Sequence, residues 1–290
     1  MSLTFEFPSD VRWAVALRIH GSRMPLSTSH AHVPLRTASV GKLLLLLAAA
    51  RRVADGSMDG GVLLRRAPED FVRDSGIWHT MTVDALPLVD VAALIGAVSD
   101  NLATNVLLRF IGLEEVASAT ASLGLMRTAL HDRVRDSRGP DDPPALSTGT
   151  ALELCWLAER LMRGSAMGGE ADRLVRGWLS AGVDQSMVGS AFVEHFGVDP
   201  LAHHDSIGSE LGFWNKTGTQ LGARADVGSA TWDGRMVSWT VIANWAPERD
   251  RALGAAVLRG MRDVGEWVVD ALAHAGSHSV EPATSSGGQT

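Results

Sequence analysis

Ser39 and Lys42 stand three residues apart at the head of an apolar run, in the stretch LRTASVGKLLLLLAAARR. On a helix, residues at this spacing share a face, and their Cβ atoms lie about 5–6 Å apart. A serine hydroxyl is a useful nucleophile only when a neighbouring base takes its proton, and a lysine can do so only when its pKa is lowered. The apolar run from Leu43 to Ala50 would bury the lysine. The pair is therefore a candidate nucleophile and base, but the four-residue pattern alone is also common by chance.

Ser99-Asp100-Asn101 is a second candidate group, in AVSDNLATN. Serine, aspartate and asparagine all favour the N-cap of a helix, so a purely structural role is one interpretation. The alternative is functional: a second hydroxyl that passes a proton to a leaving group, beside an amide that holds the substrate.

Lys216-Thr217-Gly218 is a third group, in FWNKTGTQ, a segment with the composition of a strand. One interpretation is a solvent-facing edge strand with a bulge at the glycine. In the other, Gly218 allows a close backbone approach, Lys216 provides positive charge, and the backbone N–H of Thr219 points at a developing oxyanion.

The three groups occur in the order S-x-x-K, S-D-N and K-T-G, which is a signature of class A β-lactamases and penicillin-binding proteins. From about residue 11 to 275, the chain resembles this family of serine enzymes. The resemblance implies an antiparallel sheet with flanking helices, an all-helical lobe and a site between them. Class C enzymes and many related esterases use a tyrosine in place of the S-D-N serine; this chain has no tyrosine, so that branch is excluded.

The resemblance also implies a role for each residue of these groups. Ser39 would be the acylated nucleophile and Lys42 its base, while Ser99 would relay a proton and the backbone N–H groups of Ser39 and Thr219 would form the oxyanion hole. The residues expected to bind substrate are Asn101, for an amide side chain, and Lys216, Thr217, Gly218 and Thr219, for a carboxylate and the reacting carbonyl. Arg224 is a further candidate partner for that carboxylate.

One family feature is missing from the sequence. Class A enzymes carry an E-x-x-L-N motif whose glutamate activates the water that releases the acyl group, and the corresponding segment here has no glutamate before Glu153. Substitutes would have to come from the loop acids Asp132, Asp136, Asp141 and Asp142. The favoured interpretation is that they are solvated or pair with Arg133, Arg135 or Arg138. Acylation of Ser39 is therefore better supported than turnover.

The elements that must position these groups follow from periodicity and turn residues. The patterns predict a strand over 13–19, a buried helix over 39–55 that ends at Gly56, helices between 91 and 164, and a last helix over 248–275. FWNKTGTQ, ARADVGSAT and RMVSWTVIAN predict three strands, the last two joined at Asp233-Gly234. We expect an α/β (α+β) fold: a sheet subdomain from residues 1–38 and 195–276, a mainly helical subdomain over 39–194, and a disordered tail over 277–290.

Composition limits the remaining possibilities. The net charge of −7 argues against nucleic acid as a partner, and no run approaches the ~20 apolar residues that cross a bilayer. The N-terminal residues do not form a signal peptide, so the chain as it stands is expected in the cytoplasm, although a trimmed export signal would leave no trace. Cys155, the one cysteine, is expected to be a buried thiol. Glu194, His195, His203, His204 and Asp205 match no zinc spacing, so we expect neither metal nor cofactor.

Three functions are compatible with these residues. The first is a class A-like β-lactamase, and the second is a penicillin-binding-protein-like D-Ala peptidase or an esterase. The third is a weakly catalytic sensor that stays acylated. In each, the partner is a small β-lactam, peptide or ester that carries a carboxylate. Nothing in the sequence determines the oligomeric state.

Overall fold

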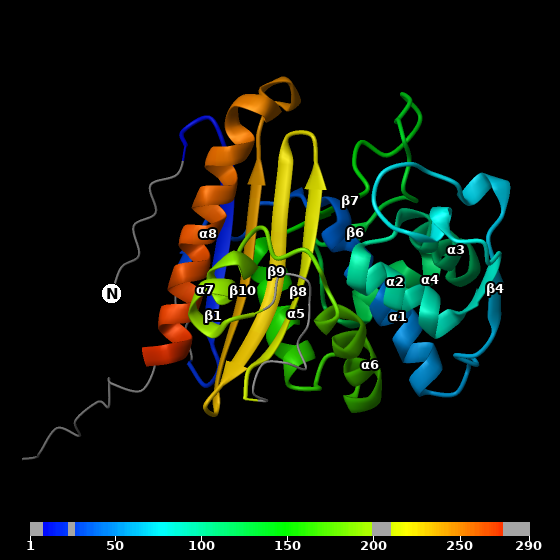
Figure 1. The fold of residues 1–290 in the computed structure, drawn as a ribbon, viewed down its shortest axis with the longest axis horizontal. Coiled ribbons are helices and arrows are strands. Elements are labelled where there is room, and N and C mark those ends of the chain that lie inside the picture. Colours follow the sequence, from blue (N-terminus) through cyan, green and yellow to red (C-terminus); the bar gives the residue numbers. More distant parts are fainter. Residues whose placement is uncertain (1–7, 23–26, 199–209, 275–290) are drawn as a thin grey trace, which may run out of the picture.

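The computed structural model describes residues 8–22, 27–198 and 210–274, and its centre is a five-stranded antiparallel sheet. The strands are β1 (Arg12–Ile19), β2 (Ser27–Ser29), β8 (Gly212–Gln220), β9 (Ala223–Trp232) and β10 (Arg235–Asn244), in the order β2-β1-β10-β9-β8. β1 thus pairs with β10, so the two ends of the chain share one sheet, as predicted (Figure 1). The short edge strand β2 was not predicted.

The turn between β9 and β10 has the expected residues. Asp233 and Gly234 both have positive φ, 49° and 72°. A two-residue hairpin with both central residues in this region matches the right-handed twist of the flanking strands, and Asp-Gly is a favoured pair there.

The two faces of the sheet are covered by different helices (Figure 1). Side chains alternate between the faces of a strand, so Val15 and Leu17 of β1 pack with α7 (Gly189–Phe196) and α8 (Asp250–His274). Ala14 and Ala16 lie in the other core, which includes α5 (Ala151–Met162). The predicted last helix is therefore present, and it begins at Asp250, after a 3-10 turn over Pro247–Arg249.

The helical half is built around α1 (Lys42–Ala54). This helix contacts α2 (Leu88–Val98), α3 (Asn101–Ile111), α4 (Leu113–Ser122) and α6 (Gly169–Ser180). Every side chain from Leu43 to Ala50 is 1% exposed or less, as the uninterrupted apolar run predicts. Complete burial of each leucine is worth about 1.5–3 kcal/mol, so this helix is a large part of the core.

The start of this helix differs from the prediction. Ser39 lies in a separate 3-10 turn, η1 (Ala38–Gly41), and the α-helix begins only at Lys42. The predicted end is correct: α1 stops at Ala54, and Gly56 follows with a φ of 74°. The tighter turn places Ser39 just before the N-terminus of α1, whereas Lys42 lies inside the core.

Small sheets and 3-10 turns complete the fold. β3 (Leu35–Arg36), β7 (Ser147–Gly149) and β6 (Ala129–Leu130) form one sheet next to η1, and β4 (Leu63–Arg65) pairs with β5 (Ala85–Pro87). Two short turns, η2 (Pro68–Asp70) and η3 (Trp78–Thr80), lie in the segment between β4 and β5. β3 and β7 thereby link the two halves of the molecule beside Ser39.

Two further expectations concern the cysteine and the absence of membrane-spanning helices. Cys155 is buried, its Sγ lies 3.3 Å from the carbonyl oxygen of Ser238, and burial raises the pKa of its thiol, as expected for a structural cysteine. Within the described ranges, no helix combines the length and apolar character needed to cross a membrane. The predicted tail over 277–290 lies outside the described residues, and the subdomain boundaries stay a prediction.

Candidate active site

Ser39 is held in place by a strained turn. Ala38, immediately before it, has a positive φ of 48°, which costs an L-residue about 1–3 kcal/mol. Ser147 on β7 stabilises this turn, since its Oγ donates to the Ala38 carbonyl at 2.6 Å and lies 2.7 Å from the Oγ1 of Thr37. A Cβ on Gly41 would lie 2.3 Å from that of Ser147, so only glycine fits there. β7 therefore fixes the backbone of the turn that carries Ser39, whose side chain is half-buried.

Lys42 is completely buried beneath this turn. Its Nζ donates to the carbonyl oxygen of Ser99 and to the Oδ1 of Asn101, both at 2.6 Å, and lies 3.2 Å from the Oγ of Ser99. Burial, followed by the charge of Lys216, holds the pKa of Lys42 well below its usual value. Without its extra proton, the amine of Lys42 has two N–H groups and one lone pair. When both N–H groups donate to these two carbonyl oxygens, the lone pair is available to accept a proton from a hydroxyl.

Ser99 joins two helices. It follows α2 in the left-handed conformation, with a φ of 55°, and α3 begins two residues later. The sequence placed this group at the start of a helix, and the capping residue is Asp100, whose Oδ1 accepts the Ala103 N–H at 2.8 Å. The structural and functional interpretations of the motif thus apply to different residues: Asp100 caps α3, while Ser99 points into the cleft.

Asp100 also anchors the η3 segment. Its Oδ2 accepts the N–H groups of Ile77 and Trp78 at 2.7 and 2.8 Å, and the carboxylate is completely buried. Gly76 passes so close that a Cβ there would lie 2.4 Å from this carboxylate. Asn101 makes a similar link, since its Nδ2 donates to the Arg73 carbonyl at 3.1 Å. The motif therefore ties the 73–78 segment to the floor of the site.

Lys216 reaches the same hydroxyl from the sheet. It lies on β8, which forms an edge of the five-stranded sheet, and its Nζ donates to the Oγ of Ser99 at 3.0 Å and to the Thr217 carbonyl at 2.9 Å. Burial lowers the pKa of Lys216 to about 8, while the charges of Asp184 and Asp226 act in the opposite direction. Lys216 is therefore mostly protonated at neutral pH.

Gly218 allows β8 to approach the serine turn. A Cβ at this position would lie 2.2 Å from the Thr37 carbonyl oxygen and 3.1 Å from the backbone nitrogen of Ser39. The close approach expected from the sequence is thus present. It brings Thr219, which is exposed on β8, to the same cleft as Ser39.

Arg224 lies elsewhere. It pairs with Thr219 on the neighbouring strand, but its Nη1 donates to the carbonyl oxygens of Gln220 and Ala223, at 2.8 and 2.9 Å. Its Nη2 lies 3.8 Å from the Oδ2 of Asp250, and its guanidinium stacks over Trp245. Arg224 is not among the residues that line the cleft.

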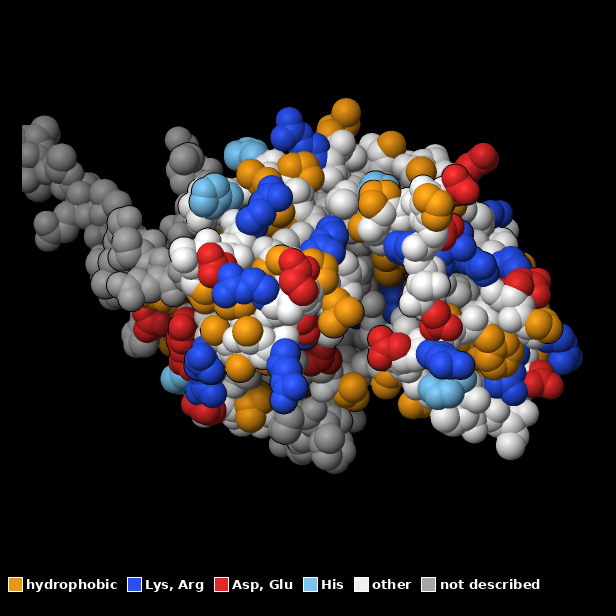
Figure 2. All heavy atoms as spheres, turned by 90° about the horizontal axis from the view of Figure 1, so that it is seen from above, with side chains coloured by type: hydrophobic (Ala, Val, Ile, Leu, Met, Phe, Trp, Pro, Cys, Tyr) orange, Lys and Arg blue, Asp and Glu red, His pale blue; other side chains and the backbone are white. Residues whose placement is uncertain are grey.

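These groups surround a cleft of about 420 Å³ between the helical and sheet halves. Figure 2 shows the surface hollowed there, with charged side chains on both sides. The cleft contains most of the predicted residues and several that the sequence analysis missed. The predicted lining residues are Ser39, Ser99, Asn101, Thr217 and Thr219; those missed include Arg73, Asp74, Ser75, Asp184 and Gln220. No motif marks the second set: residues 73–75 and Asp184 come from loops far from the motifs in the sequence, and Gln220 ends β8.

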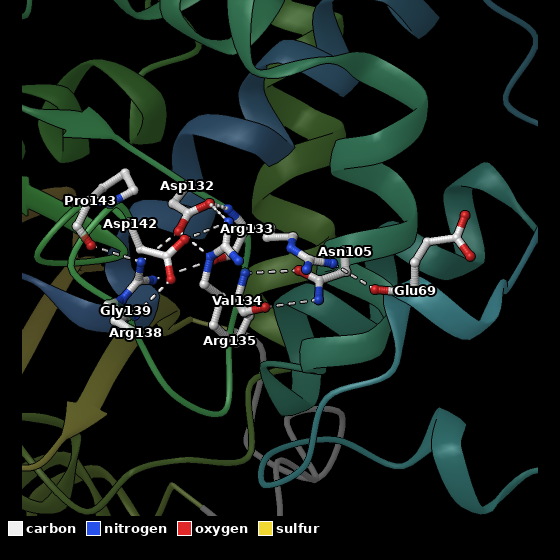
Figure 3. A network of polar contacts seen from close by, with 10 residues as sticks. All are labelled: Glu69, Asn105, Asp132, Arg133, Val134, Arg135, Arg138, Gly139, Asp142 and Pro143. Atoms are coloured by element: carbon white, nitrogen blue, oxygen red, sulfur yellow. Dashed lines mark hydrogen bonds and ion pairs between the residues drawn. The ribbon is translucent and has the colours of Figure 1, made fainter.

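The loop acids are engaged by arginines (Figure 3). The Oδ2 of Asp132 accepts from Arg135 at 2.6 Å and from Arg138 at 2.5 Å. Asp142 lies 3.1 Å from Arg135 and accepts the Gly139 N–H at 2.9 Å. The pairing favoured from the sequence is therefore present for these two acids, and Asp136 instead accepts the Arg73 N–H at 2.8 Å and lines the cleft.

The residues considered for a metal do not form a site where the structure describes them. His195 Nε2 lies 2.6 Å from the Oε2 of Glu266, and Glu194 forms an ion pair with Arg262. His203, His204 and Asp205 lie outside the described residues. Over the described ranges, no group of three or more metal-ligating side chains is present.

The arrangement can be compared with known proteins. The sequence model of the Beta-lactamase enzyme family matches residues 26–257, which include all three motifs and most of the chain. The chain belongs to the beta-lactamase enzyme family. The resemblance inferred from the motifs is thereby confirmed.

Solved structures share the fold of this family member. A β-lactamase from Sphaerobacter thermophilus is 21% identical, with a TM-score of 0.76 and coverage of 91% of either chain. PBP-A is 17% identical, with a TM-score of 0.75, over 92% of this chain and 91% of that one. The chromosome-encoded β-lactamase of Vibrio parahaemolyticus is 16% identical, with a TM-score of 0.71, over 90% of this chain and 93% of that one. At such identities the likeness establishes the fold alone. No curated protein matches the chain.

Proposed function

We propose that this protein is a serine hydrolase that forms an acyl-enzyme on Ser39 with β-lactams or related small amides or esters. One observation carries the proposal: Lys42 and Lys216 meet at the Oγ of Ser99, 3.2 and 3.0 Å away, beside the turn that carries Ser39. A structural role does not account for two buried lysines around one hydroxyl, because each pays a desolvation cost.

The first step would be attack by the Ser39 Oγ on the substrate carbonyl carbon. The neutral amine of Lys42 takes the hydroxyl proton as the new C–O bond forms, and the carbonyl oxygen becomes an oxyanion. Gly218 lets β8 approach the serine turn, and the backbone N–H groups of Ser39 and Thr219 would both donate to this oxygen.

Collapse of the intermediate would break the bond to the leaving nitrogen or oxygen. The Ser99 hydroxyl gives its proton to that atom and recovers one from Lys42, so that all protons are accounted for. Charged Lys216 stabilises Ser99 while its oxygen is partly negative. Asn101 is a positioning residue here, because its amide is engaged by Lys42 and by the Arg73 carbonyl.

Release of the acyl group requires an activated water, and two of the four loop acids are poor bases for it. Asp132 and Asp142 are engaged by Arg135 and Arg138. A carboxylate held by arginines is a weak base, since the positive charges favour its ionised form. This favours a second candidate function, in which the protein captures acyl groups and releases them slowly, as a sensor would.

A single experiment tests the proposal. The protein is mixed with a chromogenic cephalosporin and with penicillin G, and hydrolysis and intact mass are followed together. We expect a covalent adduct that maps to Ser39 and is absent in Ser39→Ala. Ser122→Ala, on the surface of α4, is a matched control and is expected to keep the adduct. Many turnovers per protein would indicate a β-lactamase, whereas a persistent adduct would indicate acyl capture. The absence of an adduct on Ser39, both with these compounds and with a panel of peptides and esters, would overturn the proposal.

A further inference from the structure

The carboxylate of Asp184 lies beside Lys216 and Thr217. These are the residues expected to bind the carboxylate of a substrate. Asp184 lies in the segment between α6 and α7 and lines the cleft together with Thr217. It also lines an adjoining hollow of about 230 Å³, where Lys216 and Thr217 lie. Neither the three motifs nor the roles implied by the resemblance include this residue.

The position of this carboxylate is fixed by several hydrogen bonds. Its Oδ1 accepts from the backbone N–H and the hydroxyl of Ser186, at 3.1 and 2.6 Å. Its Oδ2 accepts the hydroxyl of Thr217 at 2.7 Å. The backbone is held as well, since Asn215 Nδ2 donates to the Asp184 carbonyl at 3.3 Å.

Asp184 is ionised at neutral pH. Burial acts to raise its pKa, but the hydrogen bonds from Ser186 and Thr217, with the charge of Lys216, hold the pKa below its ordinary value. Lys216 is mostly protonated at the same pH. The charge of Asp184 offsets that of Lys216, which weakens the attraction of this end of the cleft for an anion.

The hydrogen bond of Thr217 leads to the same conclusion. A hydroxyl has one hydrogen to donate, and that of Thr217 is directed at Asp184. A carboxylate only accepts hydrogen bonds, so an incoming one would meet lone pairs on Thr217 and the negative charge of Asp184. An uncharged ester or carboxamide does not suffer this repulsion, and a carboxamide can donate to the Thr217 oxygen.

We propose that Asp184 is a specificity-determining residue that makes this cleft prefer acyl substrates with an uncharged ester or carboxamide, in place of a free carboxylate, at the Lys216–Thr217 end. The inference rests on the proposed acylation of Ser39 and narrows its substrate class. It replaces the charged carboxylate that the family resemblance leads one to expect there with an uncharged group.

The test compares one chromogenic cephalosporin as its free acid and as its methyl ester. The second-order rate of Ser39 acylation is measured for each by absorbance and intact mass. We expect the wild-type protein to react about tenfold faster with the ester, and Asp184→Asn to gain about tenfold with the acid while its ester rate changes less than about twofold. Asparagine keeps the size and an acceptor oxygen but removes the charge. Asp59→Asn, which removes an exposed acid that does not line the cleft, is expected to leave the acid-to-ester ratio unchanged.

The outcomes separate this inference from the proposed function. Equal wild-type rates for acid and ester, or an equal gain for both in Asp184→Asn, would overturn the role of Asp184 while leaving acylation intact. No adduct on Ser39 with either compound, nor with the peptide and ester panel, would overturn both. Thermal unfolding shows whether each variant is folded, and Asp184→Ser, which also removes the charge, replaces Asp184→Asn if the latter is not.

Discussion

Lys42 and Lys216 come from opposite halves of the cleft and reach one atom, the Oγ of Ser99, at 3.2 and 3.0 Å. Lys42 begins the central helix of the helical half, and Lys216 lies on a strand of the sheet. Burial lowers the pKa of both lysines, and the charge of Lys216 lowers that of Lys42 further, whereas the charges of Asp184 and Asp226 act to raise that of Lys216. The two lysines are thus suited to different protonation states, one neutral as a base and the other charged.

The rate of acylation should therefore depend on pH in a bell-shaped manner. The rate rises with pH as Lys42 loses its proton, with an apparent pKa well below that of a free lysine. It falls above about pH 8 as Lys216 becomes neutral. Rates from pH 5 to 10, corrected for spontaneous hydrolysis, check this.

Lys216→Arg is the matched variant for the alkaline limb. Arginine stays charged throughout this range, so the decline above about pH 8 should disappear even if the overall rate is lower. A decline that persists unchanged in Lys216→Arg would show that another group titrates there. Asp226→Asn is included because burial raises the pKa of Asp226 to about 7, within the pH range of the measurement.

Gly218→Ala should lower acylation by at least about 100-fold. The added methyl would lie 2.2 Å from the Thr37 carbonyl oxygen, so β8 must move away from the serine turn, and small displacements of reacting groups have effects of this size. Unfolding should also become easier, by about 1–3 kcal/mol. Acylation kinetics and thermal unfolding measure the two effects.

Gly254→Ala provides the comparison for this glycine. A Cβ there meets nothing within 4 Å on α8, so alanine is expected to leave acylation unchanged and to stabilise the helix by about 0.5–1 kcal/mol. Equal acylation by Gly218→Ala and the wild type would refute the close approach of β8 as a requirement.

Asp100→Ala should destabilise the protein by at least about 3 kcal/mol. The change removes the buried acceptor of the N–H groups of Ile77, Trp78 and Ala103, and unsatisfied buried donors are costly. Urea unfolding gives the free energy. Asp59→Ala, which removes an exposed carboxylate that accepts only the Gly61 N–H, should cost less than about 1 kcal/mol, and similar losses in both would contradict the anchoring role.

Asp132→Asn should lower stability at neutral pH and have little effect at pH 2. Burial raises the pKa of Asp132, but the hydrogen bonds from Arg135 and Arg138 outweigh it, so the pKa is lower in the folded protein. A carboxyl group of this kind stabilises the fold above its unfolded pKa, about 3.9, and the contribution is lost as pH falls through its folded value. We expect a loss of about 1–2 kcal/mol at pH 7.

Thermal unfolding at the two pH values measures this difference. Asp141→Asn, on an exposed residue of the same loop, is the control and should change stability by less than about 0.5 kcal/mol at either pH. A loss in Asp132→Asn that is as large at pH 2 as at pH 7 would show that charge pairing with the arginines is not the cause.

The sequence by itself determined the main elements and the resemblance to the family, but not the short strand β2 or the start of α1. The apolar run from Leu43 to Ala50 could only be a buried helix, because no face of it is polar. Asp233-Gly234 marked the hairpin, since both positions need a positive φ. These features are local, and so is each of the three motifs.

The tertiary structure decided which groups meet. The strain at Ala38 and the 3-10 turn at Ser39 depend on Ser147, more than 100 residues away. Asp184 carries no motif and becomes notable only because it lies 2.7 Å from the hydroxyl of Thr217. Charge balance in a cleft is set by distances between segments that are remote in sequence, and only packing of the core fixes those distances.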